Sequence, residues 1–322
     1  MKKRLINLRL ESPLLDVVSY GRAGPGSLSR SQRDYIERTV RRVPEVVIKV
    51  SGGARTLAGV EQSVRYVGRD GKVGLESDTG DRLGMKGFES ALVSDWNLEL
   101  EARARYTQRS IRVPRKPLKL VHNLIFSMPP GTPPQLLLKA VRKLARTQFG
   151  SDHRHALVLH TDEPHPHVHV IVKAMSEQGE RLNIRKATLR QWRQEFAANL
   201  RELGVAANAT ERAVRGHNRT SMRDGIYRAA QRGESSYVRD RVRRADTAAS
   251  SKVTLARTRG HVVDGWRAVS ERLRADGYPN LANHVDRFVT QMSRVRTDAE
   301  LIIDQARSSG RQRDARENER TR

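Results

Sequence analysis

Four of the chain's ten histidines fall within residues 160–169, together with Asp162 and Glu163. They interrupt an apolar run, LVLHTDEPHPHVHVIVKA, that covers residues 157–174. Imidazole nitrogens bind divalent metal ions and transfer protons near neutral pH. Because the chain has no cysteine, a metal site must use histidine or carboxylate ligands. This segment is therefore the first candidate for a catalytic or metal site.

Alternation along two predicted strands brings three of these histidines to one face. Side chains two positions apart share a face of a strand, so His167 and His169 point the same way. We expect residues 155–161 and 167–174 to form a hairpin in which position 160 pairs with position 167. Because cross-strand partners point the same way, His160 joins that face.

Three neutral imidazoles predict a site for Mg²⁺, Mn²⁺ or Zn²⁺ with coordination positions left open for a substrate oxygen. Asp162 and Glu163 are expected to accept hydrogen bonds from the imidazole N–H groups. His165 lies between two prolines and is a candidate for a ligand, a proton shuttle or an exposed turn residue. The third ligand is thus His160 or His165, and the shared strand face favours His160.

A second candidate is a tyrosine on the polar side of a predicted helix, residues 55–67. Apolar residues recur there at helical spacing, and Tyr66 falls on nearly the opposite face. The neighbouring Arg65, Arg69 and Lys72 stabilise a phenolate and hold phosphate oxygens. This combination suits attack of a tyrosine on a phosphodiester. The alternative is a partly exposed tyrosine that packs against another element.

Composition points to a polyanionic partner. The chain has 322 residues, a formal net charge of +25 and a pI of about 11.2. Neutralising phosphates releases condensed counterions, so nucleic acid is the commonest partner of such a chain. The basic N-terminus is broken by charges and a proline and makes a poor signal peptide, and no run is long enough to span a bilayer. We therefore expect a cytoplasmic protein without membrane insertion.

Pattern changes along the chain predict three regions. Residues 1–44 are basic and rich in Gly, Pro and Ser, which indicates a flexible arm. Residues 45–216 alternate strand and helix patterns, with a polar stretch at 76–116 expected as loop and irregular helix. This order predicts an α+β fold with an antiparallel-containing sheet and helices packed on it. Residues 217–322 are Arg-rich and mostly helical in pattern, with a disordered end.

These motifs resemble those of conjugative relaxases (mobilization nucleases) of the MOBP type, in the HUH endonuclease superfamily, and are similar to border-nicking relaxases of plant-transforming bacteria. HTDEPHPHVH fits the family's third motif, H-x-D-x-x-H-x-H-x-H, at every fixed position. YVGRDG fits the nucleophile motif Y-x-x-R-x-G, and FSMPPGT resembles the middle motif. The resemblance runs from about residue 45 to 216.

The resemblance implies that Tyr66 attacks a phosphodiester at the nick site of a plasmid transfer origin and becomes linked to the DNA 5′ end. It implies a divalent cation on His160, His167 and His169. Further residues would act in catalysis or contact the DNA: Asp162 and His165 in catalysis, and Arg55, Arg65, Arg69, Lys72 and Ser127 on the DNA. The implied partners are single-stranded origin DNA, accessory DNA-binding proteins and a type IV secretion coupling protein, with passage of the protein into a recipient cell along with the DNA.

Two other functions fit part of the sequence. HPHVHVIV resembles the signature of histidine-triad nucleotide hydrolases and transferases, in which a histidine is the nucleophile and no metal is needed. That function explains neither the charge nor the tyrosine motif. A non-catalytic DNA-binding accessory protein of a transfer complex would explain the charge but has no use for converging imidazoles.

Overall fold

The computed structural model describes residues 17, 27–83, 87–107, 118–150, 152–217, 224–232, 234–243, 249–292, 295 and 300. The chain forms two compact units. Residues 43–209 make up the first, which we call the sheet unit. Residues 1–42 and 210–322 together make up the second, which we call the helical unit.

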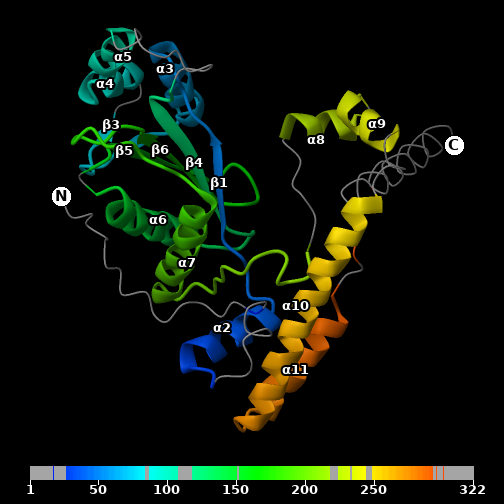
Figure 1. Ribbon diagram of the computed structural model, residues 1–322. Helices are drawn as coiled ribbons and strands as arrows, with labels where there is room; N and C mark the ends of the chain where they lie inside the picture. Colours follow the sequence, from blue (N-terminus) through cyan, green and yellow to red (C-terminus); the bar gives the residue numbers. More distant parts are fainter. Residues whose placement is uncertain are drawn as a thin grey trace, which may run out of the picture. The chain divides into compact units, whose positions relative to one another are not determined.

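The sheet unit is built on a six-stranded sheet in the order β1-β4-β6-β5-β2-β3, and all neighbouring strands run antiparallel (Figure 1). The strands are β1 (Val47–Gly52), β2 (Leu75–Ser77), β3 (Arg82–Leu83), β4 (Val121–Ser127), β5 (His155–His160) and β6 (His167–Lys173). With helices packed on it, this sheet confirms the predicted α+β class.

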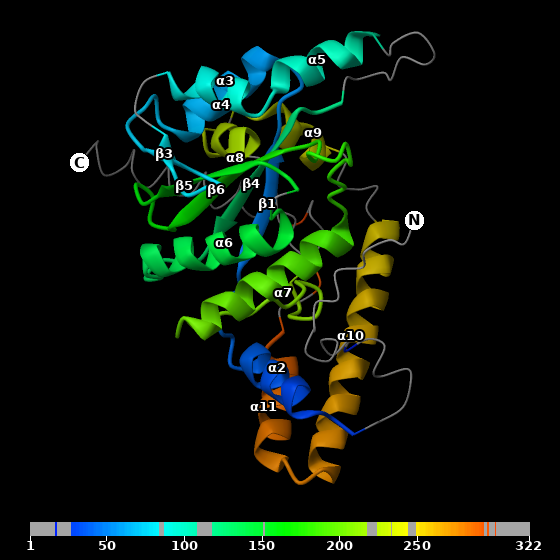
Figure 2. The same ribbon diagram turned by 90° about the vertical axis from the view of Figure 1, so that its left-hand side faces the viewer.

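Helices cover both faces of the sheet, as Figures 1 and 2 show. One face carries α6 (Pro134–Gln148) and α7 (Lys186–Glu202). The other carries α3 (Leu57–Val67), α4 (Phe88–Asp95) and α5 (Leu98–Thr107). The buried apolar side chains of α3, α6 and α7 face the sheet, as expected of helices that stabilise one face of a sheet.

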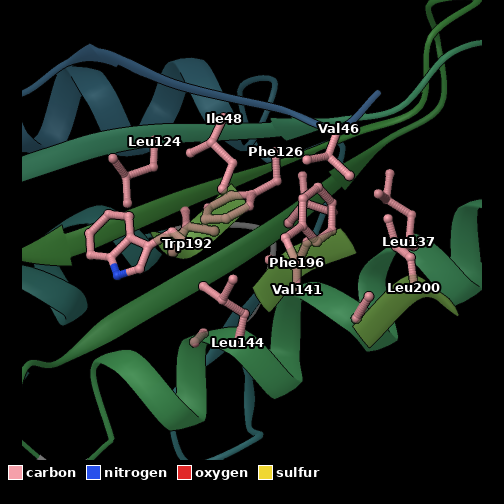
Figure 3. Close-up of a cluster of buried hydrophobic side chains, with 14 of the residues drawn as sticks. Val46, Ile48, Leu124, Phe126, Leu137, Val141, Leu144, Trp192, Phe196 and Leu200 are labelled. Atoms are coloured by element: carbon pink, nitrogen blue, oxygen red, sulfur yellow. The ribbon is translucent and has the colours of Figure 1, made fainter. Parts of the chain in front are cut away.

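The larger hydrophobic core lies between the sheet and α6 and α7 (Figure 3). Its aromatic rings meet edge to face: Phe126 contacts Phe196 and Phe149 contacts Trp192, each with ring centroids 5.4 Å apart. This is the favoured geometry of aromatic pairs, because the positive edge of one ring meets the negative face of the other. The packing holds the central strands β4, β6 and β5 rigid, and these strands carry the histidines.

Alternation along β6 divides its side chains between the two faces as predicted. Val168, Val170 and Val172 belong to the larger core, whereas Ile171 belongs to the cluster beneath α3, α4 and α5. His167 and His169 share the face of Ile171. The histidines therefore lie on the same side of the sheet as α3.

Residues 76–116, expected as loop and irregular helix, instead contribute β2, β3, α4 and α5 among the described positions. Polar residues hide the apolar pattern of these short elements. Leu92, Trp96 and Leu98 are nevertheless almost fully buried and complete the second hydrophobic cluster. Tertiary packing overrides weak local propensity here.

The helical unit contains α2 (Arg30–Val40), α8 (Asp224–Gln231), α9 (Ser236–Arg243), α10 (Ala249–Ala275) and α11 (Pro279–Thr290). None of the helices described in either unit combines the length and apolarity needed to cross a bilayer. The unit's core joins both ends of the described chain: Tyr35 and Ile36 of α2 belong to the same buried cluster as Trp266 of α10 and Phe288 of α11.

The flexible arm expected over residues 1–44 therefore contains an ordered helix, α2. A capping box starts this helix, because the Ser29 hydroxyl accepts from the Gln32 backbone N–H and the Gln32 side chain accepts from the Ser29 N–H. Its buried residues then supply the apolar stripe. The bounds of 45–216 and 217–322 for the nuclease domain and its extension remain a prediction.

A separate group of histidines lies at the other end of the sheet, on the face of α6 and α7. His122 and His155 both pair across to Val172 and so share its face. Both ring nitrogens of His122 are buried without a hydrogen-bond partner among the described residues. Burial lowers the pKa of His122 from 6.5 to about 4, and the positive charges of Lys119 and Arg181 add to this effect.

The low pKa of His122 predicts sensitivity to acid. The folded state favours the neutral imidazole, so its contribution to stability is fully present above pH 6.5 and is lost as the pH falls toward 4. We expect His122→Gln to make the urea unfolding midpoint depend less on pH in this window. The reduction should correspond to about one proton fewer taken up on unfolding. The control is His261→Gln, which removes an exposed imidazole and leaves His122 in place. Equal pH dependence in His122→Gln and the parent would contradict the prediction.

Candidate active site and metal centre

Three imidazoles meet where β5 ends and β6 begins. His160 stands directly opposite His167 in the β5–β6 register, and His169 lies two positions further along β6. The ring centroids of the three are 4.6 to 5.1 Å apart. One nitrogen from each ring lies within 4.8 Å of the others, and the three residues are buried. The structure thus confirms the predicted hairpin and brings together the three predicted metal ligands.

Hydrogen bonds to backbone carbonyls fix two of these rings. His160 Nε2 lies 2.7 Å from the Val67 carbonyl oxygen, and His167 Nδ1 lies 3.1 Å from the His165 carbonyl oxygen. Because a carbonyl only accepts, these nitrogens carry the protons and the other nitrogen of each ring keeps its lone pair. His160 Nδ1 is buried and has no hydrogen-bond partner among the described residues. A buried lone pair without a partner is costly, and a bound cation would satisfy it.

Electrostatics keep the rings in the form that binds metal. Burial lowers the pKa of His169 to about 3, and the neighbouring His160 and His167 add to this effect. Burial also lowers the pKa of His160, although its hydrogen bond to Val67 opposes this change. Since a metal-binding imidazole must be neutral, both rings are ready to bind at neutral pH. The residues present therefore fit a divalent cation.

Tyr66 lies on the last turn of α3, and 66% of its surface is exposed. The next residue, Val67, provides the carbonyl that holds His160. The end of the tyrosine's helix is thereby joined directly to the imidazole group. A second bond anchors α3 nearby, since Asn123 Nδ2 of β4 donates to Ser63 Oγ at 3.1 Å. Asn123 shares the histidine face through its pairing with Ile171.

The turn after α3 is strained in a way that positions Arg69. Arg69 and Asp70 have φ of +52° and +55°, a left-handed conformation that costs a non-glycine residue about 1–2 kcal/mol. Gly71 completes the turn with φ of +82°. In this conformation the Arg69 guanidinium carbon lies 5.9 Å from the centre of the Tyr66 ring. Such strain persists where the surroundings require it, and it gathers at functional sites.

Arg69 also ties the tyrosine's turn to the histidine segment. Its Nη2 donates to Asp162 Oδ2 at 2.7 Å. We expected Asp162 and Glu163 to accept from the imidazoles, but for His160 and His167 that expectation is wrong. Backbone carbonyls take that place, because both rings are buried while both carboxylates are exposed.

His165 is not part of the imidazole group. Its side chain is exposed in the turn between β5 and β6, and its backbone carbonyl makes the contact to His167. The group consists of His160, His167 and His169, so the structure favours His160 over His165 as third ligand. The histidine-triad signature instead uses positions 165, 167 and 169. This arrangement counts against that alternative.

The predicted DNA contacts fall into two sets. Ser127 pairs directly with His167 and therefore lies beside it on the histidine face. Arg65 and Lys72 are exposed at the end of α3, and Arg65 pairs with Glu89 at 3.2 Å. Arg55 precedes α3, at the opposite end of the helix from Tyr66, and the structure does not bring it to the imidazoles.

One cation near the site was not anticipated. Lys49 of the edge strand β1 pairs with Ile125 of β4, which in turn pairs with His169. Lys49 is exposed and shares the histidine face. Alternation along β1 indicates that Lys49 points to the opposite face from Ile48. Its position near the histidines depends on the pairing of β1 with β4, which a single sequence does not reveal.

Residues 77–205 match the family model described as "Relaxase: MobA/VirD2-like, nuclease domain". The match includes the three clustered histidines and Ser127, and it begins after Tyr66. The comparisons find no curated protein and no solved structure that matches the chain. Over residues 77–205 the chain is therefore similar to the nuclease domain of MobA/VirD2-like relaxases.

Proposed function

We propose that the protein nicks one strand of DNA at a plasmid transfer origin by attack of Tyr66 on a phosphodiester, in support of conjugative mobilization. The observation that carries this proposal is the hydrogen bond between His160 and the carbonyl of Val67. It joins the residue next to the tyrosine to the imidazole group, although the two lie 93 positions apart in sequence. One phosphate of the DNA could then contact both Tyr66 and a cation held by the imidazole group.

The tyrosine supplies the new bond to phosphorus. The Tyr66 phenolic oxygen bonds to the phosphorus atom as the phosphorus–O3′ bond breaks, so the 3′-OH is released and the protein remains linked to the DNA 5′ end. The ester bond is exchanged rather than hydrolysed, and the strand can be rejoined later. The phenolic proton passes to a base at the site, for which Asp162 and His165 are the candidates near α3 and the turn.

The basic residues around Tyr66 would hold the substrate. Arg69 is placed by Tyr66 and Asp162 and can present its guanidinium to phosphate oxygens. Arg65, Lys72, Ser127 and Arg55 would contact the strand on either side, and an exposed phenol ring offers a surface for base stacking. A Mg²⁺, Mn²⁺ or Zn²⁺ ion on His160, His167 and His169 would polarise a non-bridging oxygen and stabilise the charge that develops on it.

The substrate of this chemistry is single-stranded origin DNA, since the nucleophile must reach a phosphodiester freed from the duplex. Accessory DNA-binding proteins would expose that strand. A type IV secretion coupling protein would receive the protein with its attached DNA. A non-catalytic accessory protein would bind DNA as well, but it would gain nothing from three buried, converging imidazoles, whose burial costs free energy.

Labelled oligonucleotides test the proposal. The protein is incubated with single-stranded origin oligonucleotides carrying a label at either end, with Mg²⁺ or Mn²⁺ or with a chelator. We expect the 3′-end label to move with the protein under denaturing conditions and the 5′-end label to appear on a shorter free strand. The chelator should suppress both. Two free fragments without an adduct would contradict tyrosine attack.

A further inference from the structure

A charged groove lies on the side of the sheet unit away from the imidazoles. It runs between α6 and α7, which cover the opposite face of the sheet from α3. Its volume is about 530 Å³, and its lining residues are Lys139, Arg142, Lys143, Arg146, Thr147, Asn199, Glu202 and Leu203. No step of the proposed nicking reaction uses these side chains.

One helix supplies all four cations of the groove. They stand at positions i, i+3, i+4 and i+7 of α6 and so share one helix face. Two of them are engaged within the fold: Arg142 donates to both carboxylate oxygens of Glu76, and Lys143 pairs with Glu202.

The other two cations remain available to a ligand. Lys139 and Arg146 are exposed and form no hydrogen bond or ion pair within the part of the chain that the structure describes. They are seven positions apart in α6, which is about 10 Å along the helix axis. Their charges can therefore meet two different phosphates of one nucleic-acid backbone.

The lining identifies the kind of partner. Tyr66, Tyr237 and Tyr278 are the large exposed aromatic residues among the described positions, and none of them lines the groove. Protein partners are usually anchored by buried aromatic or aliphatic side chains, and single strands stack their bases on aromatic rings. A duplex backbone needs neither, because its phosphates are held mainly by lysine and arginine side chains.

We propose that the α6–α7 groove binds the phosphate backbone of double-stranded DNA without regard to sequence, as a second DNA site distinct from the nicking centre. The formal net charge of +25 is in keeping with more than one such DNA-binding surface. Binding of duplex DNA here would keep the protein on the DNA while the single strand is engaged on the other face.

The variant Lys139→Gln/Arg146→Gln tests the groove. Affinity for a short duplex of arbitrary sequence is measured by fluorescence anisotropy over a range of salt concentrations. We expect weaker binding to every duplex alike and a salt dependence whose log–log slope is smaller by about 2, close to one for each phosphate that the variant no longer neutralises. Nicking of single-stranded oligonucleotides should match the parent, because neither residue lies at the imidazoles.

The charge-preserving variant Lys139→Arg/Arg146→Lys is the matched control and should keep the parent's affinity and slope. Unchanged duplex affinity and slope in the glutamine variant would overturn the proposal. The proposal would also be overturned if the parent bound poly-glutamate and the glutamine variant lost that binding while it still bound duplex DNA. That result would assign the groove to an acidic protein. Failure of the parent to form a DNA adduct would overturn the proposed nicking reaction and leave the duplex measurement to be judged separately.

Discussion

Tyr66→Phe is expected to abolish the covalent protein–DNA adduct while leaving non-covalent DNA binding in place. The substitution removes one oxygen, the atom proposed to bond to phosphorus, and keeps the ring beside Arg69. Loss of the nucleophile from a covalent mechanism lowers the rate by factors on the order of 10⁶ in well-studied hydrolases. The adduct should therefore disappear under denaturing conditions, and anisotropy with single-stranded DNA should give nearly the parent's affinity.

The helical unit offers a matched control. Tyr278→Phe removes the hydroxyl from another exposed tyrosine whose ring also meets an arginine, with Arg33 at 4.5 Å. We expect this variant to form the adduct at the parent's rate. An adduct that persists in Tyr66→Phe would assign the nucleophile to a different residue. A joint loss of adduct and DNA binding in that variant would mean that the hydroxyl acts in binding rather than in attack.

His167→Ala is expected to reduce cleavage at a fixed metal concentration by about 10²–10³-fold, the cost of losing one stabiliser of developing negative charge. The variant loses one of three converging ligands and the ring that His165 orients. Because two ligands remain, higher Mg²⁺ or Mn²⁺ should restore part of the activity. The rate is measured as adduct formed over time at several metal concentrations.

His165→Ala separates the metal role from a general effect on the turn. The two residues are two positions apart, but the His165 side chain is exposed and its carbonyl survives the substitution. Any loss of cleavage in this variant, including one from removing a candidate base, should not be restored by added metal, in contrast to His167→Ala. Equal losses in the two variants, without rescue by metal, would rule out the assigned ligand set.

Local periodicity was enough to predict the imidazole group. Alternation in β6 separates His167 and His169 from the valines, and pairing across a short turn adds His160. Both signals depend only on neighbours in sequence, and so does the apolar stripe of α3 that leaves Tyr66 on the exposed side. The α+β class followed from the same patterns.

Features that depend on distant contacts were not predictable. The Val67 carbonyl that holds His160 carries no side-chain signal, and the placement of Lys49 depends on the pairing of β1 with β4. The short elements within 76–116 have weak apolar patterns and are stabilised by the burial of residues such as Trp96. The capping box at Ser29 indicates the start of α2 in the sequence, but the basic composition of the surrounding residues favoured a flexible arm instead.

The shared core of the helical unit limits how the nuclease can be excised for study. Tyr35 and Ile36 come from the beginning of the chain and pack in one cluster with Trp266 and Phe288 from near its end. Deleting only the C-terminal part would expose Tyr35 and Ile36 to solvent, and deleting only the N-terminal part would expose Trp266. Either truncated protein would be prone to aggregation. A soluble recombinant nuclease should therefore be trimmed at both ends together, to residues 43–209.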